Sequence, residues 1–558
     1  MTVDPFTLAV VHNSLISIAR EMKAITMRTA YTQIWKEQGD LSCCLMDSSG
    51  DIVAQDPTGF PAHITTMPYQ LQGALDVIGR ETLVEGDVII TNDPYIGGTH
   101  LPDVMIARPI FWEGRMIAFA CNRGHWADIG GMGPGSYSAA TPEIFQEGLF
   151  IAPVKLISAG QINQPVMDII LSNVRNRSNA AGDLRAQYAS CATGEARMHA
   201  LLERYGSEVV SSAMEEVLQR SEALTRASIE RIPDGVYRAS DQLDGDGLSE
   251  SAVPIELTMT VDGSSIDFDL TRSADQSRGG MNCSHAAAAA GIQYAVKAMT
   301  DPENPPNAGS YRPISVRTRP GSVVDAQAPS AMVGFGEVAY KLTDAAFQAL
   351  GQAMPDRAVG AGSGSTGTVV IGGRRSDNGK SLYFYALELS SGAHGARPGR
   401  DGTNAMRYGA GNAGHIPIEA DELENPLLFE RYEIVADTGG AGRYRGGNAF
   451  CRVFRVNADD AKICITADRH ATSPTGILGG QSGSVARYVL NPGRDDERAL
   501  TSKTPYVPLP RGTIVWLQSA GGGGRENPKM RDRDSVISDL RNGYISREEG
   551  HRMYGHKD

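Results

Sequence analysis

Apolar residues near the start of the chain recur every three or four positions, at Val11, Leu15, Ile18, Met22 and Ile25. This spacing places them on one face of a helix. Asp4 followed by Pro5 is typical of a helix start, because aspartate can cap the first turn and proline fits its first position. We therefore predict an amphipathic helix that ends near residue 32.

The next segment predicts β-structure and further helices. Two apolar runs, 41–46 and 52–55, are separated by an Asp-Ser-Ser-Gly turn and predict a hairpin. A strand is predicted over 87–91. His63 lies in a segment with prolines on both sides, which predicts a solvated histidine in a loop. Helices are predicted over residues 69–80, 165–205 and 207–230.

A strong helix breaker, Ile-Pro-Asp-Gly at 232–235, indicates a domain boundary. Alternating strands and two helices follow it, and from about residue 430 the chain consists of short strands and glycine turns. We predict an α+β fold, a strand-rich chain of several lobes. Its predicted domains are 1–232, an N-terminal part with helices and hairpins; 233–429, a central α/β part; and 430–558, a β-rich part with a terminal helix.

The composition narrows the class of protein. Among 558 residues, 41% are hydrophobic and 21% charged, which is typical of a soluble protein. The net charge of −13, without a basic run, argues against nucleic acid or an anionic membrane as partner. Seven scattered cysteines without CxxC spacing favour reduced thiols in the cytoplasm. We see no signal peptide or membrane span, so a cytoplasmic location is expected.

A second hairpin is predicted between residues 92–104 and 122–131, where two apolar segments flank Glu113-Gly114. With the turn centred there, the numbers of paired residues sum to about 227, so Asp103 lies near Gly124. Pro109 in the first strand indicates an edge or a bulge, which could shift this register by one.

The open end of this hairpin gathers His100, Asp103 and His125. Two imidazoles and one carboxylate suit a divalent metal with positions left for water or substrate. The alternative is that both histidines are hydrogen-bonded turn residues and Asp103 caps a strand, because HxxD alone is a common pattern. Asp128 is a candidate for orienting a ligand imidazole.

Other catalytic signatures are weak. The GxGxxG match at 362–367 precedes a strand, whereas a dinucleotide site follows one. The P-loop-like segment 373–381 contains Asn378-Gly379, a better hairpin turn. There is no GxSxG elbow and no cysteine in a nucleophile motif. A hydrolase without a nucleophile needs activated water, which a metal can supply.

Several motifs in order along nearly the whole chain resemble the hydantoinase B/oxoprolinase family. They are NDPYIGGTHLPDV at 92–104, HWADIGG at 125–131, EIFQEGLFIAPVKL at 143–156, GDLRAQ at 182–187, ARPGRDG at 396–402, ERYEIVADTGGAGRYRGG at 430–447 and AGGGG at 520–524. The family includes ATP-dependent N-methylhydantoinases, 5-oxoprolinase, caprolactam-type lactamases, and the acetone and acetophenone carboxylases. The resemblance implies a B-type subunit in a hetero-oligomer, whose hydantoinase A-type partner holds ATP and Mg.

In the metal-containing carboxylases of this family, the ligands fall on an HxxD and a following histidine. These positions correspond to His100, Asp103 and His125, and the resemblance leaves Mn, Zn and Fe open. Trp126 stands where many members have a second histidine, and an indole cannot replace imidazole as a ligand. Lys36, Glu37 and Asp40 match a family segment of the form IKExxD, and His63 matches a family histidine. These matches imply that the residues line the site.

The resemblance implies that the chain hydrolyses a small cyclic amide, such as a hydantoin, oxoproline or a lactam. Water would attack a carbonyl that the partner subunit has phosphorylated, with Asp128 or Glu143 as candidate general base. Three alternatives remain: a subunit of an ATP-dependent ketone carboxylase, an assembly subunit with an inactive site, and a mononuclear iron oxygenase.

Overall fold

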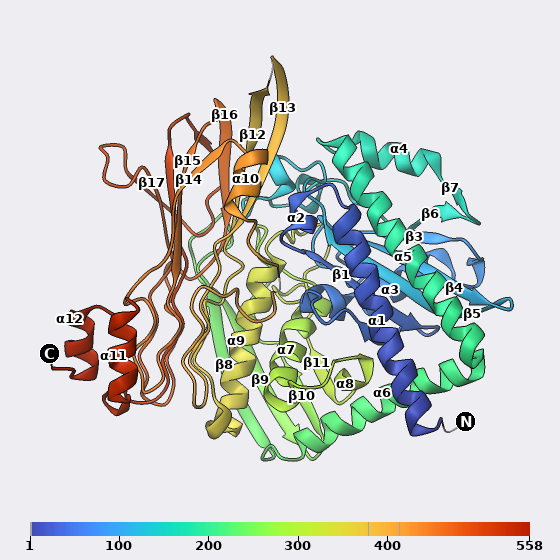
Figure 1. Cartoon of the computed structure of the whole chain (residues 1–558), viewed down its shortest axis with the longest axis horizontal. Coiled ribbons are helices and arrows are strands. Elements are labelled where there is room, and N and C mark those ends of the chain that lie inside the picture. Colours follow the sequence, from blue (N-terminus) through green and yellow to red (C-terminus); the bar gives the residue numbers. More distant parts are fainter. Residues whose placement is uncertain (1–2, 378, 412, 558) are drawn as a thin grey trace.

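The computed structural model describes residues 3–377, 379–411 and 413–557. Seven antiparallel strands near the N-terminus form one sheet in the order β2-β1-β5-β4-β3-β6-β7 (Figure 1). They are β1 (Leu41–Asp47), β2 (Ile52–Gln55), β3 (Val88–Thr91), β4 (Asp103–Trp112), β5 (Arg115–His125), β6 (Val154–Ser158) and β7 (Gln161–Ile162).

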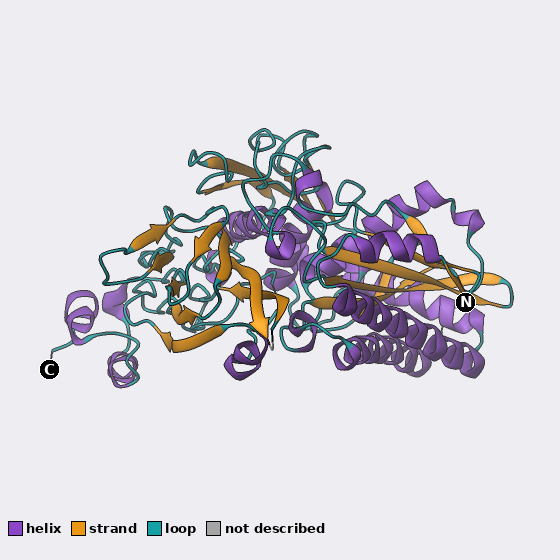
Figure 2. Ribbon diagram, turned by 90° about the horizontal axis from the view of Figure 1, so that it is seen from above, coloured by secondary structure: helices purple, strands orange, loops and turns teal. Residues whose placement is uncertain are grey.

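Helices cover both faces of this sheet. Because side chains alternate along a strand, Cys43 and Leu45 of β1 join the core under α1 (Pro5–Thr29) and α5 (Arg177–Tyr205), while Cys44 and Met46 pack toward α3 (Pro61–Ile78). The remaining helices of this part are α2 (Gln33–Lys36), α4 (Gln164–Ser172) and α6 (Ser207–Ile229). Figure 2 shows α1, α5 and α6 gathered on one side of the strands.

The prediction for His63 was wrong. Helix α3 starts at Pro61 and not near residue 69, because Pro61 occupies the first helical position, where a missing N–H costs nothing. Pro68 lies inside the helix without ending it. His63 is therefore on the first turn of a packed helix and is only 2% exposed.

The central part packs a second sheet against two long helices. The sheet has the order β11-β10-β9-β8, and α9 lies across β8 and β9 while also packing on α7. Helix α7 in turn contacts α3, which joins this part to the first sheet. The elements are β8 (Gly235–Leu243), β9 (Val253–Asp262), β10 (Ser265–Asp269), α7 (His285–Thr300), α8 (Ala308–Tyr311), β11 (Ile314–Arg317) and α9 (Phe335–Ala353).

Two sheets form the strand-rich half of the molecule, with orders β13-β12-β16-β19 and β14-β15-β20-β17-β18. Ile371, Phe454 and Val515 belong to one core between them. The elements are β12 (Thr368–Asp377), β13 (Lys380–Leu389), α10 (Ile418–Glu424), β14 (Leu427–Ile434), β15 (Phe450–Val456), β16 (Asp460–Thr466), β17 (Arg487–Leu490), β18 (Arg498–Leu500), β19 (Val507–Leu509), β20 (Ile514–Gln518), α11 (Arg533–Arg541) and α12 (Arg547–Glu549).

The predicted α+β class is confirmed. Strands β12 and β13 pair as predicted, although Asn378 of their predicted turn lies outside the described residues. They also join the sheet of β16 and β19, so the segment 368–389 packs with the C-terminal strands. All seven cysteines are free and buried. Within the described ranges, no helix has the length and apolar character needed to span a bilayer.

Candidate metal centre

The hairpin of β4 and β5 positions two of the three predicted ligands. Near the turn, Phe111 pairs with Met116, but a bulge between Ile110 and Phe111 shifts every later pair by one. Asp103 therefore lies directly opposite His125 rather than opposite Gly124. Pro109 sits next to the bulge, beyond the end of the β3 ladder, where its missing N–H leaves no bond unmade.

Three donor atoms converge at the open end of this hairpin. His100 Nε2 lies 3.0 Å from Asp103 Oδ1 and 3.1 Å from His125 Nδ1. His125 Nδ1 lies 3.2 Å from Asp103 Oδ1. All three side chains are buried, with at most 3% of the residue surface exposed.

The spacing of these atoms fits a single ion. For an ion about 2.1 Å from each atom, separations near 3.1 Å correspond to angles of about 95°, as on one face of an octahedron. Two imidazole nitrogens and one carboxylate on a face form a ligand set used for divalent metals, with the opposite positions left for water or substrate. The residues present therefore fit the metal that the sequence predicts.

Further contacts hold each ligand in place. The second oxygen of Asp103, Oδ2, accepts a hydrogen bond from Thr99 Oγ1 at 2.5 Å and lies 3.1 Å from His63 Nε2. His100 Nδ1 faces the carbonyl oxygen of Val333 at 3.3 Å, a contact that leaves Nε2 for the metal when Nδ1 carries the proton. His63 therefore supports a ligand and is not itself one of the three.

His125 is fixed through its backbone. Its N–H donates to the carbonyl of Asp40 at 3.1 Å, and its own carbonyl accepts from Trp35 Nε1 at 2.8 Å. Nε2 of the same ring is buried and has no hydrogen-bond partner among the described residues. This nitrogen is available to a water molecule or substrate.

Electrostatics favour the protonation state that a metal needs at Asp103 and His100, but not at His125. Burial opposes ionisation of Asp103, but the neighbouring His100 and His63 hold its pKa well below the usual value. Burial lowers the pKa of His100, which keeps its imidazole neutral. Burial also opposes the charged form of His125, yet its hydrogen bond to Asp103 raises its pKa.

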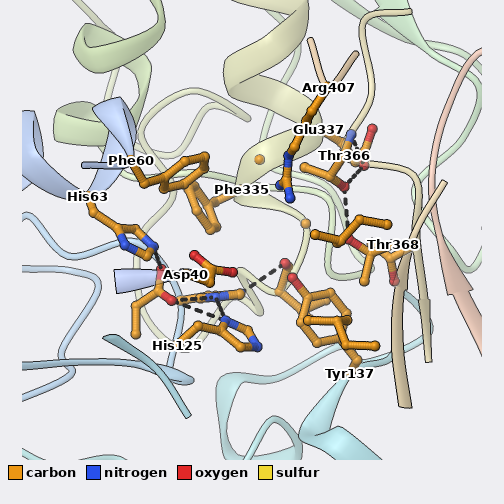
Figure 3. Close-up of a pocket in the computed structure, with 18 residues that line it drawn as sticks. Asp40, Phe60, His63, His125, Tyr137, Phe335, Glu337, Thr366, Thr368 and Arg407 are labelled. Atoms are coloured by element: carbon orange, nitrogen blue, oxygen red, sulfur yellow. Dashed lines mark hydrogen bonds and ion pairs between the residues drawn. The ribbon is translucent and has the colours of Figure 1, made fainter. Parts of the chain in front are cut away.

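The surrounding cavity is small and is built from distant parts of the chain. Its volume is about 30 Å³, room for roughly two water-sized groups. Figure 3 shows the cavity with the histidine cluster at one end and Arg407, Glu337 and Thr366 at the other. The lining also includes Asp40, Phe60, Tyr137, Val333, Phe335 and Thr368.

Three of the predicted catalytic residues do not line this cavity. Glu37 and Glu143 are exposed, and Glu143 caps the short helix at Ile144–Gln146. Asp128 is buried but is paired with Arg175 at 2.6 Å in a neighbouring, larger cavity. Of the predicted catalytic residues, only His63 lies in the cavity with the three ligands.

Sequence reasoning missed most of the opposite wall. Tyr137, Glu337, Thr366 and Arg407 stand in no motif that indicates catalysis, and three of them lie more than two hundred residues beyond the hairpin. Asp40 was expected to line the site from its match to a family segment, and it does line the cavity.

Comparison with known proteins agrees with the fold. The model of the family described as hydantoinase B/oxoprolinase matches residues 4–528, and the chain belongs to this family. The B subunit of a putative D-/L-hydantoinase from Pseudomonas sp. (strain NS671) is 30% identical over 99% of this chain and 95% of its own length. The beta subunit of caprolactamase from Pseudomonas jessenii is 30% identical over 99% of this chain and 96% of its own.

Two solved structures share the whole architecture. The ATP-dependent caprolactamase from Pseudomonas jessenii superposes with a TM-score of 0.91 at 28% identity, over 100% of this chain and 96% of that one. The nucleotide-free structure of acetone carboxylase gives 0.89 at 20% identity, over 99% and 79%. The match to acetone carboxylase shows a common fold. The match to caprolactamase also adds a relative of named activity.

Proposed function

We propose that the chain is the metal-containing B-type subunit of an ATP-dependent cyclic amide hydrolase. The observation that carries this proposal is the convergence of His100, Asp103 and His125 within 3.2 Å of one another in a buried cavity. The family, with its hydantoinase and caprolactamase members, supports a substrate with a cyclic amide bond.

These three residues would hold a divalent ion, and Mn, Zn and Fe all accept such a set. When bound, the ion would supply a Lewis acid that lowers the pKa of water toward ~7 and draws electron density from a carbonyl oxygen. The protein's own part is to fix the three donor atoms. Thr99, His63 and the Val333 carbonyl do this by holding Asp103 and His100.

The cavity also offers groups for proton transfer. Asp40 and Glu337 both line it. Burial raises the pKa of Glu337, so this carboxyl keeps its proton more readily than an exposed glutamate and suits a general acid. Asp40 is next to His125 in the cavity. It is therefore the candidate general base, in place of Asp128 or Glu143, which the sequence suggested.

The proposed reaction requires a partner. A plain amide is a poor electrophile, so an ATP-dependent A-type subunit would first phosphorylate the carbonyl oxygen to give an imidate phosphate. Water then adds to the carbonyl carbon, the carbon–nitrogen bond breaks, and the nitrogen takes a proton, which leaves an acyl phosphate. A second water releases inorganic phosphate and the free carboxylate. Two of the relatives are themselves named as single subunits of larger enzymes, which supports such a hetero-oligomer.

The test combines metal analysis with ATP-coupled ring opening. In complex with its partner, His100→Ala should lose bound metal and ring opening together, because one of three ligands is gone. Metal content is measured by mass spectrometry, and products are followed with a hydantoin, an oxoproline and a lactam. Full activity with full metal content would contradict the proposal.

The alternative is a ketone carboxylase, which the shared fold with acetone carboxylase keeps open. The same complex is therefore assayed with a ketone and bicarbonate. Bicarbonate-dependent consumption of the ketone, without ring opening of any cyclic amide, would favour the carboxylase.

A further inference from the structure

Arg407 lies in the wall of the cavity, in the loop between β13 and α10. Figure 3 shows its guanidinium pointing into the cavity, toward the end that holds His125 and Asp40. Two contacts fix the loop at this point. The Met406 carbonyl accepts a hydrogen bond from Ala393 N, and the Arg407 carbonyl faces His394 Nε2 at 2.8 Å. The direction of the side chain is thus set by the fold.

Two nitrogens of the Arg407 guanidinium lack partners. Nε and Nη1 are shut off from solvent and have no hydrogen bond to any described residue. Five buried arginines in the described parts of the chain have carboxylate partners, among them Arg452 with Glu388, Arg469 with Asp241 and Arg531 with Asp401. Arg123 is buried without a carboxylate, but both of its terminal nitrogens donate hydrogen bonds. Burying charged donors without partners lowers the stability of the fold, so the unpaired nitrogens of Arg407 indicate a functional role.

Burial opposes the charge of Arg407, but the nearby Tyr340 hydroxyl and Asp40 carboxylate raise its pKa, so the guanidinium stays charged without forming an ion pair within the described ranges. Among the described residues, no carboxylate lies within ion-pair distance of its guanidinium, although Asp40 and Glu337 share the cavity. Glu337 uses Oε1 to accept a hydrogen bond from Thr366 N at 2.9 Å, and its other oxygen is unpaired. Phe60 contributes only a ring face, with its centroid 5.8 Å from the guanidinium carbon.

We propose that Arg407 forms an oxyanion subsite that holds a carboxylate or phosphate group opposite the three metal ligands. A planar guanidinium with free N–H donors binds both groups through charge-assisted hydrogen bonds. The inference rests on the proposed function for its place in the reaction, because the acyl phosphate and the two products all carry such a group.

The two ends of the cavity would then have different roles. The histidine and aspartate end faces the carbonyl carbon and the attacking water. At the other end, the Arg407 guanidinium would hold the anionic group in place and neutralise its charge. This contact would also orient the carbonyl. Arg407 is thus assigned to substrate and product binding, and it leaves metal binding to the other residues.

The inference is tested by anion binding to the full chain, measured by calorimetry at constant ionic strength with acetate, inorganic phosphate and chloride. Arg407→Gln should weaken binding of the preferred oxyanion by about 10- to 100-fold, with metal content and melting temperature close to wild type. Arg407→Lys should bind at an intermediate level, because it keeps the charge but loses the planar donors. Tighter binding of acetate assigns a carboxylate, and tighter binding of phosphate assigns a phosphoryl group.

The matched control is Arg400→Gln, which removes an exposed charge from the same loop and should leave anion binding unchanged. Equal loss in Arg400→Gln, unchanged binding in Arg407→Gln, or no oxyanion binding by the wild type would each overturn the inference. The proposed function fails separately: a wild-type chain that holds no metal, yet binds acetate or phosphate through Arg407, would sink the hydrolase proposal and leave the subsite standing.

Discussion

Two buried charged clusters in this protein differ in how completely their groups are paired. Around Asp468, Lys341 and Lys503 lie at 2.8 and 2.5 Å, and Arg469 reaches Asp241 and Asp344 at 2.6 and 2.7 Å. Three cations thus pair with three carboxylates, so the charges cancel within the protein; we call this the closed cluster. Such a cluster connects α9 to the loop after β16 and needs no ligand.

The histidine cluster of His63, His100, Asp103 and His125 differs, because some of its polar groups have no partner in the described parts of the chain; we call it the open cluster. It gathers three donors around one point, contains no lysine, and leaves His125 Nε2 and His63 Nδ1 without partners among the described residues. Across the cavity, Nε and Nη1 of Arg407 are unpaired in the same sense. Lys341 Nζ and Arg469 Nε also lack hydrogen bonds within the described ranges, but both side chains have ion-pair partners and neither lines the cavity. The feature that marks a site here is therefore a set of unpaired groups that face the same small cavity.

The largest expected effect comes from opening the closed cluster. Asp468→Ala leaves two buried lysines without their carboxylate, so the free energy of unfolding should fall by about 3–5 kcal/mol. Urea denaturation followed by circular dichroism measures the loss. Metal content of the protein that remains folded should match wild type, and a loss of metal at unchanged stability would show that the two clusters do not differ as described.

A smaller effect is expected at Glu147, which supports the open cluster from outside. Its Oε1 accepts hydrogen bonds from the N–H groups of Met332 and Val333 at 2.8 and 2.7 Å, and the Val333 carbonyl faces His100. Glu147→Ala should therefore weaken metal affinity by about 10- to 100-fold, measured by competition with a chelator. Glu147→Gln should restore it, because an amide oxygen can accept the same two bonds.

The matched control for this prediction is Asp244→Ala. Asp244 also accepts two consecutive backbone N–H groups, from His470 and Ala471, but beside the closed cluster. Its loss should lower stability without changing the affinity for metal. If both alanine variants reduce metal affinity equally, Glu147 has only a general structural role.

The last effect is spread over acid pH, so that it is small within any one pH unit, and concerns His470 beside the closed cluster. Burial lowers the pKa of His470 to about 4. Between pH 6.5 and 4 the unfolded chain takes up a proton that the folded chain does not, so stability should fall as the pH falls, by about 1.4 kcal/mol per unit. His470→Gln should flatten this part of the stability profile. An unchanged slope would show that the histidine is not held neutral by burial.

Much of the site follows from local sequence. His100, Asp103 and His125 lie within 26 residues, and one hairpin is enough to join them. Pro109 indicated the bulge whose one-residue shift brings Asp103 opposite His125. His63 was placed in a loop because prolines usually interrupt helices, whereas Pro61 at the first helical position starts one.

The roles of Asp128, Glu143 and Glu37 stay predictions, although the structure places these side chains away from the cavity. Each stands next to a motif, but nearness along the chain does not set the direction of a side chain. Arg175 draws Asp128 into a neighbouring cavity, and Glu143 is used as a helix cap. Their positions depend on partners that a local pattern does not contain.

The sequence by itself determined the α+β class, the hairpin with its three candidate ligands, and the family. These features depend on short spacings and on the order of motifs, which a single chain displays directly. Only the tertiary structure decided that His63 is buried behind Asp103, that Val333 faces His100, and that Arg407 closes the cavity. Those contacts join residues up to about three hundred positions apart, and the packing of α9 and the loop after β13 against the first sheet creates them.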